Sequence, residues 1–301
     1  MRDTFLAADH RTELMDRPLK SPNTGMRHSI RPRRSLLADT TPAELPATIE
    51  EPRRPERTTA YRPDPSMPRW HDLSLVEAGA RQKSRIALPV VDNDRESASV
   101  RAFDLLRTRL RQTTQEHGWT NIAITAPTSG CGTTFTAANL ALSLSRVAGS
   151  RTLLMDFNLR NPGIANALNV TAPGPVTDLL QGHSAIGDHL FRVSETLALG
   201  LNSTPDRNAS ETLQSAETAH ALERMRASLQ PELVLYDLPA MLAYDDVSAF
   251  LPQLDGVLLV SDGTQTMAQQ LLECERMLEG QVPLLGVVLN RARANSIPRY
   301  S

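Results

Sequence analysis

The sequence predicts an α/β fold in which helices cover both faces of a doubly wound, mostly parallel β-sheet. Two observations lead to this prediction. Short, continuously apolar segments such as 152–155 (TLLM), 233–236 (LVLY) and 256–260 (GVLLV) have the composition of strands that are buried on both faces. Stretches with a helical spacing of apolar residues alternate with these segments, which is typical of parallel strands joined by crossover helices.

The chain before the sheet has a different composition. Residues 1–70 hold ten of the 21 prolines and 23 charged side chains of both signs. A segment of this kind buries too little apolar surface to offset the entropy that is lost when it becomes ordered. We therefore predict a disordered, Pro/Arg-rich arm over residues 1–70. We interpret it as a solvated tether, with binding to an acidic membrane or partner as the alternative.

The remaining chain divides into three parts. We predict a linker with room for a short helix, a folded domain and a flexible tail, over residues 71–93, 94–293 and 294–301. The strands predicted in the domain are 122–125, 152–155, 197–201, 233–236, 256–260 and 284–289. The predicted helices are 95–112, 134–146, 210–229 and 265–278. In sheets with this order of elements, ligands bind beyond the carboxyl ends of the strands.

Residues 126–134 (APTSGCGTT) follow the first predicted strand and have the outline of a phosphate-binding P-loop. Such a loop aims backbone N–H groups at a phosphate on the N-terminus of the next helix. Gly130 and Gly132 are suited to the tight turn, and the hydroxyl of Thr134 stands where these loops bind Mg²⁺. We predict that residues 130–134, which include Cys131, contact a nucleotide.

Thr133 occupies the position at which a P-loop has the lysine that contacts the β- and γ-phosphates. Lys20 and Lys83 are the two lysines of the chain, and both precede the loop. A substitute cation therefore has to be an arginine or come from another subunit. Arg160 is the candidate within the chain, because it closely follows a predicted strand end.

Polar side chains end three of the predicted strands. Asp156 and Asp237 follow apolar strands, and an acid in this position near a P-loop holds Mg²⁺ directly or through water. We assign both residues catalytic and metal-binding roles, with Thr134 as the third metal-side group; a plain helix N-cap is the alternative for either acid. Asn290 ends the last strand, where its amide is placed to contact a base, or else forms a turn.

Cys131 and Cys274, the two cysteines, have no metal-binding spacing and suggest a reducing compartment. For Cys131 we favour a small residue tolerated at a variable loop position, with a redox role as the alternative. The sequence contains no apolar run of the roughly 18 residues that a membrane span needs, and no signal peptide. We therefore expect a cytoplasmic protein.

The motifs follow one another in a single order along residues 94–293. They are SASVRAFDLLRTRL, APTSGCGTTFTAANLA, LLMDFNLRNP, PVTDLLQG, NASETLQS, LVLYDLPAMLAYDD, DGVLLV and LLGVVLNRAR. This order resembles the bacterial tyrosine-kinase (BY-kinase) family of capsule and exopolysaccharide biosynthesis. That family lies within the deviant-Walker P-loop group that includes chromosome-partitioning ATPases.

The resemblance implies a fold of the P-loop NTPase type and a site for ATP or ADP with Mg²⁺, the binding of which is weakened or lost here. It also implies a partner, the cytoplasmic part of a membrane polysaccharide co-polymerase. Through this partner the protein would lie at the inner face of the plasma membrane. A homo-oligomer is compatible with the resemblance, and nucleic acid is not an expected partner.

Departures from the family pattern fall on parts that phosphoryl transfer needs. Thr133 replaces the Walker A lysine, and Asn158 stands where the Walker A′ motif has its second acid. The family's tyrosine-rich tail, which is its autophosphorylation substrate, is reduced to Tyr300. We therefore expect a degenerate regulator of exopolysaccharide assembly in which a nucleotide is a structural or switching ligand.

The helix before the loop departs from the pattern as well. The family places Glu-x-x-Arg-x-x-Arg there for contacts between subunits of a ring, whereas this chain has Arg101, Asp104 and Arg107. Two of the three charges are reversed. The alternative is that these are solvated charges at i, i+3 spacing on a helix face.

Three other functions stay open at the level of the sequence. An active tyrosine kinase would use an arginine in place of the lysine, and a partitioning-type ATPase would use the same loop for positioning. A dinucleotide-binding oxidoreductase is disfavoured, because Phe135 occupies the position of the third glycine of its loop. That function would also leave Asp237 and Asn290 without a role.

Overall fold

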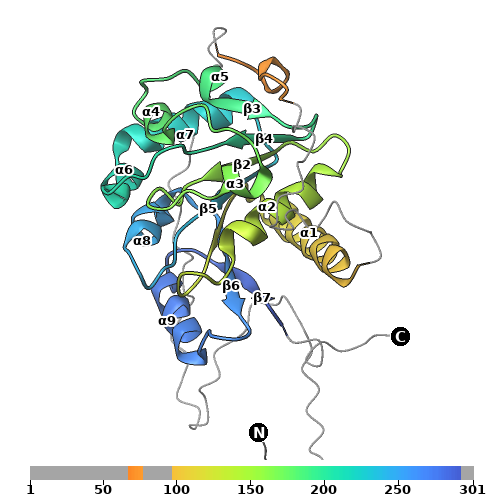
Figure 1. Ribbon diagram of the computed structural model, residues 1–301, viewed down its shortest axis with the longest axis vertical. Coiled ribbons are helices and arrows are strands. Elements are labelled where there is room, and N and C mark those ends of the chain that lie inside the picture. The colour runs from red at the N-terminus through yellow and green to blue at the C-terminus, as the bar shows by residue number, and fades with distance from the viewer. Residues whose placement is uncertain (1–66, 77–96, 293–301) are drawn as a thin grey trace, which may run out of the picture. The chain divides into compact units, whose positions relative to one another are not determined.

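The computed structural model describes residues 67–76 and 97–292 and contains one seven-stranded sheet (Figure 1). In chain order the strands are β1 (Asn121–Thr125), β2 (Thr152–Asp156), β3 (Leu190–Arg192), β4 (Leu197–Gly200), β5 (Leu233–Asp237), β6 (Gly256–Asp262) and β7 (Leu284–Asn290). Across the sheet the order is β3-β4-β2-β5-β1-β6-β7, and every neighbouring pair is parallel except β3 and β4. The prediction of a doubly wound, mostly parallel sheet is confirmed.

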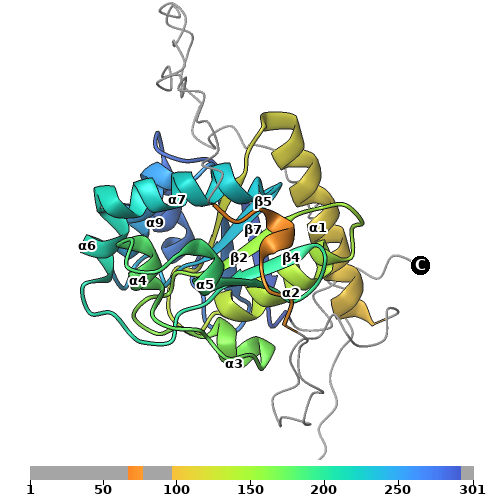
Figure 2. The ribbon, with the colours of Figure 1, turned by 90° about the horizontal axis from the view of Figure 1, so that it is seen from above.

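Helices cover both faces of this sheet. They are η1 (Trp70–Asp72), α1 (Ala98–His117), α2 (Thr133–Ser145), α3 (Ile164–Leu168), α4 (Val176–Leu180), α5 (Ile186–His189), α6 (Ala209–Gln214), α7 (Ala216–Leu229), α8 (Asp246–Phe250), η3 (Leu251–Gln253) and α9 (Ala268–Leu278). Figure 2 shows α7 and α9 on one side of the strands and α2 and α3 on the other. Among these described helices, none is both long and apolar enough to cross a bilayer.

Side chains that alternate along β1 illustrate why the sheet needs both layers. Ile122 and Ile124 lie in the buried cluster that contains residues of α1, α2 and α3, whereas Ala123 lies in the cluster with residues of α4 to α9. All three are completely buried. Strands of this kind are apolar at every position because no face meets water, which is why the sequence pattern identified them.

The helix predicted over residues 95–112 is α1, and its ends are set by caps. Ser97 precedes it, and the Ser97 hydroxyl accepts a hydrogen bond from the Val100 amide at 3.3 Å. Gly118 closes it in a left-handed conformation, with φ of +65°, and donates its amide to the Thr114 carbonyl. Serine and glycine are favoured at these two positions for these reasons. The helix therefore begins and ends later than the apolar spacing alone indicated.

The helix predicted over residues 210–229 is in fact two helices, α6 and α7. Ser215 closes α6 and at the same time caps α7, since its hydroxyl accepts a hydrogen bond from the Thr218 amide at 3.1 Å. Ser215 has an extended backbone, with φ of −65° and ψ of 150°. A serine side chain that replaces a backbone partner in this way ends one helix and starts the next.

Residues 67–76 pack against the folded domain. Trp70 is 1% exposed, and its indole N–H donates to the Glu195 carbonyl at 2.9 Å. Leu75 forms a parallel bridge with Arg192 of β3. The arm predicted over 1–70 thus ends in residues with a packed structure, because the large apolar surface of Trp70 is buried. Residues 1–66, 77–96 and 293–301 lie outside the described part, and so do the predictions made for them.

Candidate functional site

Three polar side chains from separate segments meet at the carboxyl ends of β1, β2 and β5. Asp156 and Asp237 are direct partners in the parallel register of β2 with β5, and both are completely buried. Thr134, in the first turn of α2, donates its hydroxyl to Asp237 Oδ2 at 2.6 Å. The strand order brings these residues together because β5 lies between β1, which leads into the loop, and β2.

The two carboxyl groups have different surroundings. Asp156 Oδ2 accepts hydrogen bonds from the amides of Gly163 and Ile164, each at 3.0 Å, at the start of α3. The helix-capping alternative therefore holds for one oxygen of Asp156. The other oxygen, Asp156 Oδ1, and Asp237 Oδ1 are buried and have no hydrogen-bond partner among the described residues.

Buried oxygens without a partner are costly unless another group satisfies them. No group of three or more His, Cys, Asp or Glu side chains in the described chain is placed to hold a metal ion. The donor set here is two carboxylates and the hydroxyl of Thr134. Mg²⁺ suits such a set, because it retains several waters and takes its remaining ligands from one or two carboxylates and substrate phosphates. The residues present therefore fit Mg²⁺.

Burial changes the acidity of both aspartates. It raises the pKa of Asp156 to about 7, although hydrogen bonds from the amides of Ile164, Gly163 and Asn158 oppose the shift. Burial, followed by the charge of Asp156, raises the pKa of Asp237 well above its usual value, and the hydrogen bond from Thr134 opposes this shift. The raised pKa values favour the protonated forms of Asp156 and Asp237 when no cation is bound, and a bound cation would favour the carboxylates.

The glycine loop has the backbone that its sequence indicated. Gly130 and Gly132 are both left-handed, with φ of +83° and +96°. Gly132 is the N-cap residue of α2 and has no side chain with which to cap the first amides of that helix. These amides are the donors that bind phosphate in a P-loop. A Cβ atom at Gly132 would lie 2.2 Å from Asn290 Nδ2, so the close approach of β7 also requires glycine.

We expect Gly132→Ala to lower the free energy of unfolding by about 1–3 kcal/mol more than Gly149→Ala does. Gly149 is a matched control, because its φ is +76° but an added Cβ would meet nothing within 4 Å. Both variants carry the backbone strain, and only Gly132→Ala adds the clash with Asn290. Urea denaturation of both variants measures the difference; equal effects would mean that the contact with Asn290 is easily relieved.

Asn290 binds the loop itself. Its Nδ2 donates to the Cys131 carbonyl at 2.9 Å, and its Oδ1 accepts from the Arg291 amide at 2.9 Å. The amide that was predicted to contact a base therefore ties β7 to the loop in this structure. Contact with a base remains a proposal for Asn290.

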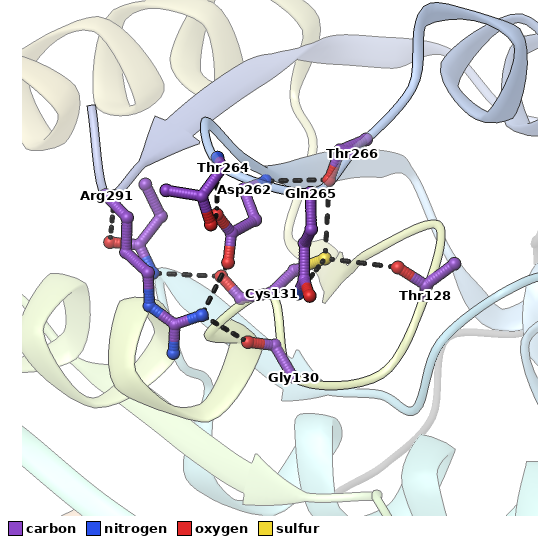
Figure 3. Close-up of polar contacts among 9 residues, drawn as sticks. Thr128, Gly130, Cys131, Asp262, Thr264, Gln265, Thr266 and Arg291 are labelled. Carbon is purple, nitrogen blue, oxygen red and sulfur yellow. Dashed lines mark hydrogen bonds and ion pairs between the residues drawn. The ribbon is translucent and has the colours of Figure 1, made fainter. Parts of the chain in front are cut away.

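Arg291 is a site residue that the sequence analysis missed. Its Nη1 donates to the Gly130 carbonyl at 3.0 Å and forms an ion pair with Asp262 Oδ2 (Figure 3). Asp262 ends β6 with a completely buried side chain, and its Oδ1 accepts from the amide and the hydroxyl of Thr264 at 2.8 and 2.6 Å. The available signal in the sequence was an arginine directly after the polar end of the last strand.

Cys131 is buried inside the loop. Its Sγ lies 3.5 Å from the hydroxyls of Thr128 and Thr266 and 4.0 Å from Gln265 Nε2 (Figure 3). Burial raises the pKa of the Cys131 thiol, but hydrogen bonds from Thr128 and Thr266 outweigh it and the net pKa is lowered. The thiol thus joins the loop to the segment after β6. Since Cys131 is only 1% exposed, oxidants have little access to it.

Arg160, the predicted substitute for the lysine, is bound elsewhere. Its Nε and Nη2 form a bidentate ion pair with Asp246, each at 2.8 Å, and its Nη1 donates to the Arg207 carbonyl at 2.9 Å. The guanidinium also lies over the ring of Tyr244, 4.5 Å from its centroid. Asp246 is completely buried at the start of α8. In this structure the Arg160 side chain is bound to Asp246 and the Arg207 carbonyl, because a buried carboxylate pairs with its charge.

The charges predicted on the helix before the loop make contacts within the chain. Asp104 pairs with Arg107 at 2.9 Å and with Arg146 at 3.6 Å, and it accepts a hydrogen bond from the Ser143 hydroxyl at 2.7 Å. Asp104 therefore joins α1 to the end of α2. Contacts of this helix with a second subunit remain a prediction.

The fold and site can be compared with known proteins. No family model matches the chain. Succinoglycan biosynthesis transport protein ExoP of Rhizobium meliloti is 30% identical over 192 residues, which cover 60% of this chain and 23% of ExoP. Tyrosine-protein kinase CpsD of Streptococcus agalactiae serotype Ia is 25% identical over 202 residues, which cover 66% of this chain and 84% of CpsD. The chain spans about a quarter of the length of relatives such as ExoP.

The kinase domain of the Escherichia coli tyrosine kinase ETK has the same fold, with a TM-score of 0.64 and 22% identity over 73% of this chain and 86% of that domain. A glycine loop between β1 and α2, with acids at the ends of the neighbouring strands β2 and β5, defines a protein of the P-loop NTPase fold. Within that fold class, the chain is similar in sequence to bacterial tyrosine-protein kinases such as CpsD.

Proposed function

We propose that the protein is a degenerate BY-kinase-like regulator of exopolysaccharide or capsule assembly, in which a nucleotide acts as a structural or switching ligand. One observation carries this proposal. Thr134 donates to Asp237, which lies beside Asp156, and each carboxyl group has one buried oxygen without a partner among the described residues. Thr133 stands at the position of the lysine.

The loss of the lysine affects nucleotide binding and phosphoryl transfer to different extents. Loss of one charge-assisted contact weakens binding by roughly 1.5–3 kcal/mol. Loss of a donor that strengthens in the transition state lowers the rate by about 10²–10³. Asn158 removes a further acid from the A′ segment. Binding of nucleotide therefore survives these changes better than phosphoryl transfer does.

The partner that we propose is the cytoplasmic part of a membrane polysaccharide co-polymerase, which would hold the protein at the inner face of the membrane. The name of ExoP, a transport protein of succinoglycan biosynthesis, supports a role in such a system. A nucleotide would regulate the partner only through a difference in its affinity for two conformations of this protein. Assembly into a homo-oligomer is part of the same proposal.

Calorimetric titration with ATP and ADP in the presence of Mg²⁺ tests the nucleotide site. We expect Thr133→Lys to bind ATP roughly 10- to 100-fold more tightly than the wild type, because it restores one charge-assisted contact. Asp237→Ala should weaken Mg²⁺-dependent binding in both backgrounds. Equal affinity of the wild type and Thr133→Lys would contradict our account of the loop.

An active tyrosine kinase is the second candidate, and the contact of Arg291 with Gly130 favours it, since a positive side chain does reach the loop. ATP turnover and tyrosine phosphorylation, each compared with Asp156→Ala, separate the two functions. If the wild type is active and Asp156→Ala is not, the protein is an active tyrosine kinase and the proposal of a degenerate regulator is wrong.

A further inference from the structure

The glycine loop contacts a positive side chain, although its own lysine position holds threonine. Arg291 reaches the loop from the end of β7 and donates from Nη1 to the Gly130 carbonyl at 3.0 Å. Figure 3 shows the guanidinium between the loop and Asp262. A cation is thus already placed next to the part of the loop that precedes α2.

The position of Arg291 is defined by the elements around it. Asp262 and Asn290 are direct partners in the parallel register of β6 with β7, so the buried Asp262 lies beside the residue that precedes Arg291. Thr264 holds Asp262 through two hydrogen bonds. Arg291 has a left-handed backbone, with φ of +52°, which is uncommon for a residue with a side chain. The guanidinium is therefore anchored at the end of β6.

The contacts that the structure gives for the Arg291 side chain all involve Nη1. Within the described chain, Nε and Nη2 have no hydrogen-bond partner, and the side chain is 55% exposed. A guanidinium carries its positive charge at any physiological pH and offers two parallel N–H groups to a phosphate. One edge of Arg291 thus holds the protein, and the other is available to an anion.

We propose that Arg291 provides the positive charge that Thr133 does not, by binding the terminal phosphates of a nucleotide at the N-terminus of α2. The inference rests on the proposed nucleotide site and identifies a positive contact to which a lysine at position 133 would add a second one. Asp262 keeps the guanidinium in place before the nucleotide binds. Arg291 therefore takes the role that Arg160, held by Asp246, does not fill.

Calorimetric titration of the full chain with ATP, ADP and AMP in the presence of Mg²⁺ tests this role. We expect Arg291→Gln to weaken ATP binding about 10- to 100-fold and AMP binding less than about threefold, because only the terminal phosphates contact the guanidinium. Arg276→Gln is the matched control, since Arg276 is exposed on α9 and its side chain pairs with Glu273 of the same helix. It should leave both affinities unchanged.

Two further variants separate a phosphate contact from a structural latch on Gly130. Arg291→Lys keeps the charge and the pairing with Asp262 but loses the second N–H edge, so ATP should bind about tenfold more weakly than to the wild type. Arg291→Lys also tests the phosphate contact if Arg291→Gln does not fold. Adding Thr133→Lys to Arg291→Gln should restore ATP binding, because the new lysine takes over the charge.

The outcomes distinguish this inference from the proposed function. If wild type and Arg291→Gln bind ATP equally, or if ATP and AMP are weakened alike without rescue by Thr133→Lys, Arg291 is not a phosphate ligand and the nucleotide site stands. If neither the wild type nor Thr133→Lys binds any of the three nucleotides, the proposed function and this inference both fail.

Discussion

Asp237→Asn should raise the stability of the nucleotide-free protein at pH 8 by about 1–3 kcal/mol, the usual cost of a buried polar group without a partner, or roughly 3–10 °C in melting temperature. Asp237 is completely buried next to Asp156, and neither Asp156 Oδ1 nor Asp237 Oδ1 has a partner among the described residues. Burial disfavours the charged form of both groups. An asparagine removes one of the two charges and can still accept the hydrogen bond from Thr134.

The sign of the pH dependence follows from the raised pKa values. A carboxyl group whose pKa is higher in the folded state contributes stability that is fully present below its unfolded pKa, near 3.8, and is lost as pH rises through its folded pKa. For Asp156 this window runs from about pH 4 to about 7. The wild type should therefore lose stability over this range, and the gain from Asp237→Asn should shrink towards pH 5.

Thermal denaturation at pH 5, 6, 7 and 8, with and without Mg²⁺ and ATP, measures this effect. Asp188→Asn is the control, because Asp188 is an exposed aspartate of α5. Addition of Mg²⁺ and ATP should stabilise the wild type and Asp188→Asn but not Asp237→Asn. A variant less stable than the wild type at pH 8 would show that the folded protein favours the Asp237 carboxylate.

Arg160→Gln should lower the free energy of unfolding by about 3–5 kcal/mol, because it leaves the buried carboxylate of Asp246 without its partner. The bidentate pair and the contact with the Tyr244 ring hold the start of α8 against the segment after β2. Urea denaturation of the variant and the wild type measures the loss. Arg276→Gln, which removes an exposed pair with Glu273, should change stability by less than about 1 kcal/mol.

The double variant Arg160→Gln/Asp246→Asn provides the internal test. It removes the unpaired charge as well, so it should be more stable than Arg160→Gln alone. If Arg160→Gln has a small effect on stability but a large effect on ATP binding, Arg160 is instead the cation that binds phosphate at the loop. We expect the loss of stability, since the guanidinium of Arg160 binds the Arg207 carbonyl and the Asp246 carboxylate.

The fold could be predicted where burial gives a short segment a continuously apolar composition. Strands such as β2 and β5 are buried at every position, so their apolar composition identified them. β3 was missed because it has three residues and pairs antiparallel at the edge of the sheet. The break at Ser215 was missed because the apolar spacing continues through it, while the serine hydroxyl replaces a backbone hydrogen bond.

For the candidate site, the sequence predicts that Gly130, Thr134, Asp156 and Asp237 come together, because the carboxyl ends of parallel strands share one edge of a sheet. Only the tertiary structure decided which arginine reaches the loop. That choice depends on the pairing of β6 with β7, which places Asp262 beside Arg291, and on the buried Asp246, which holds Arg160. Contacts between segments far apart in the chain produce no periodic pattern in the sequence, so the spacing of residues does not predict them.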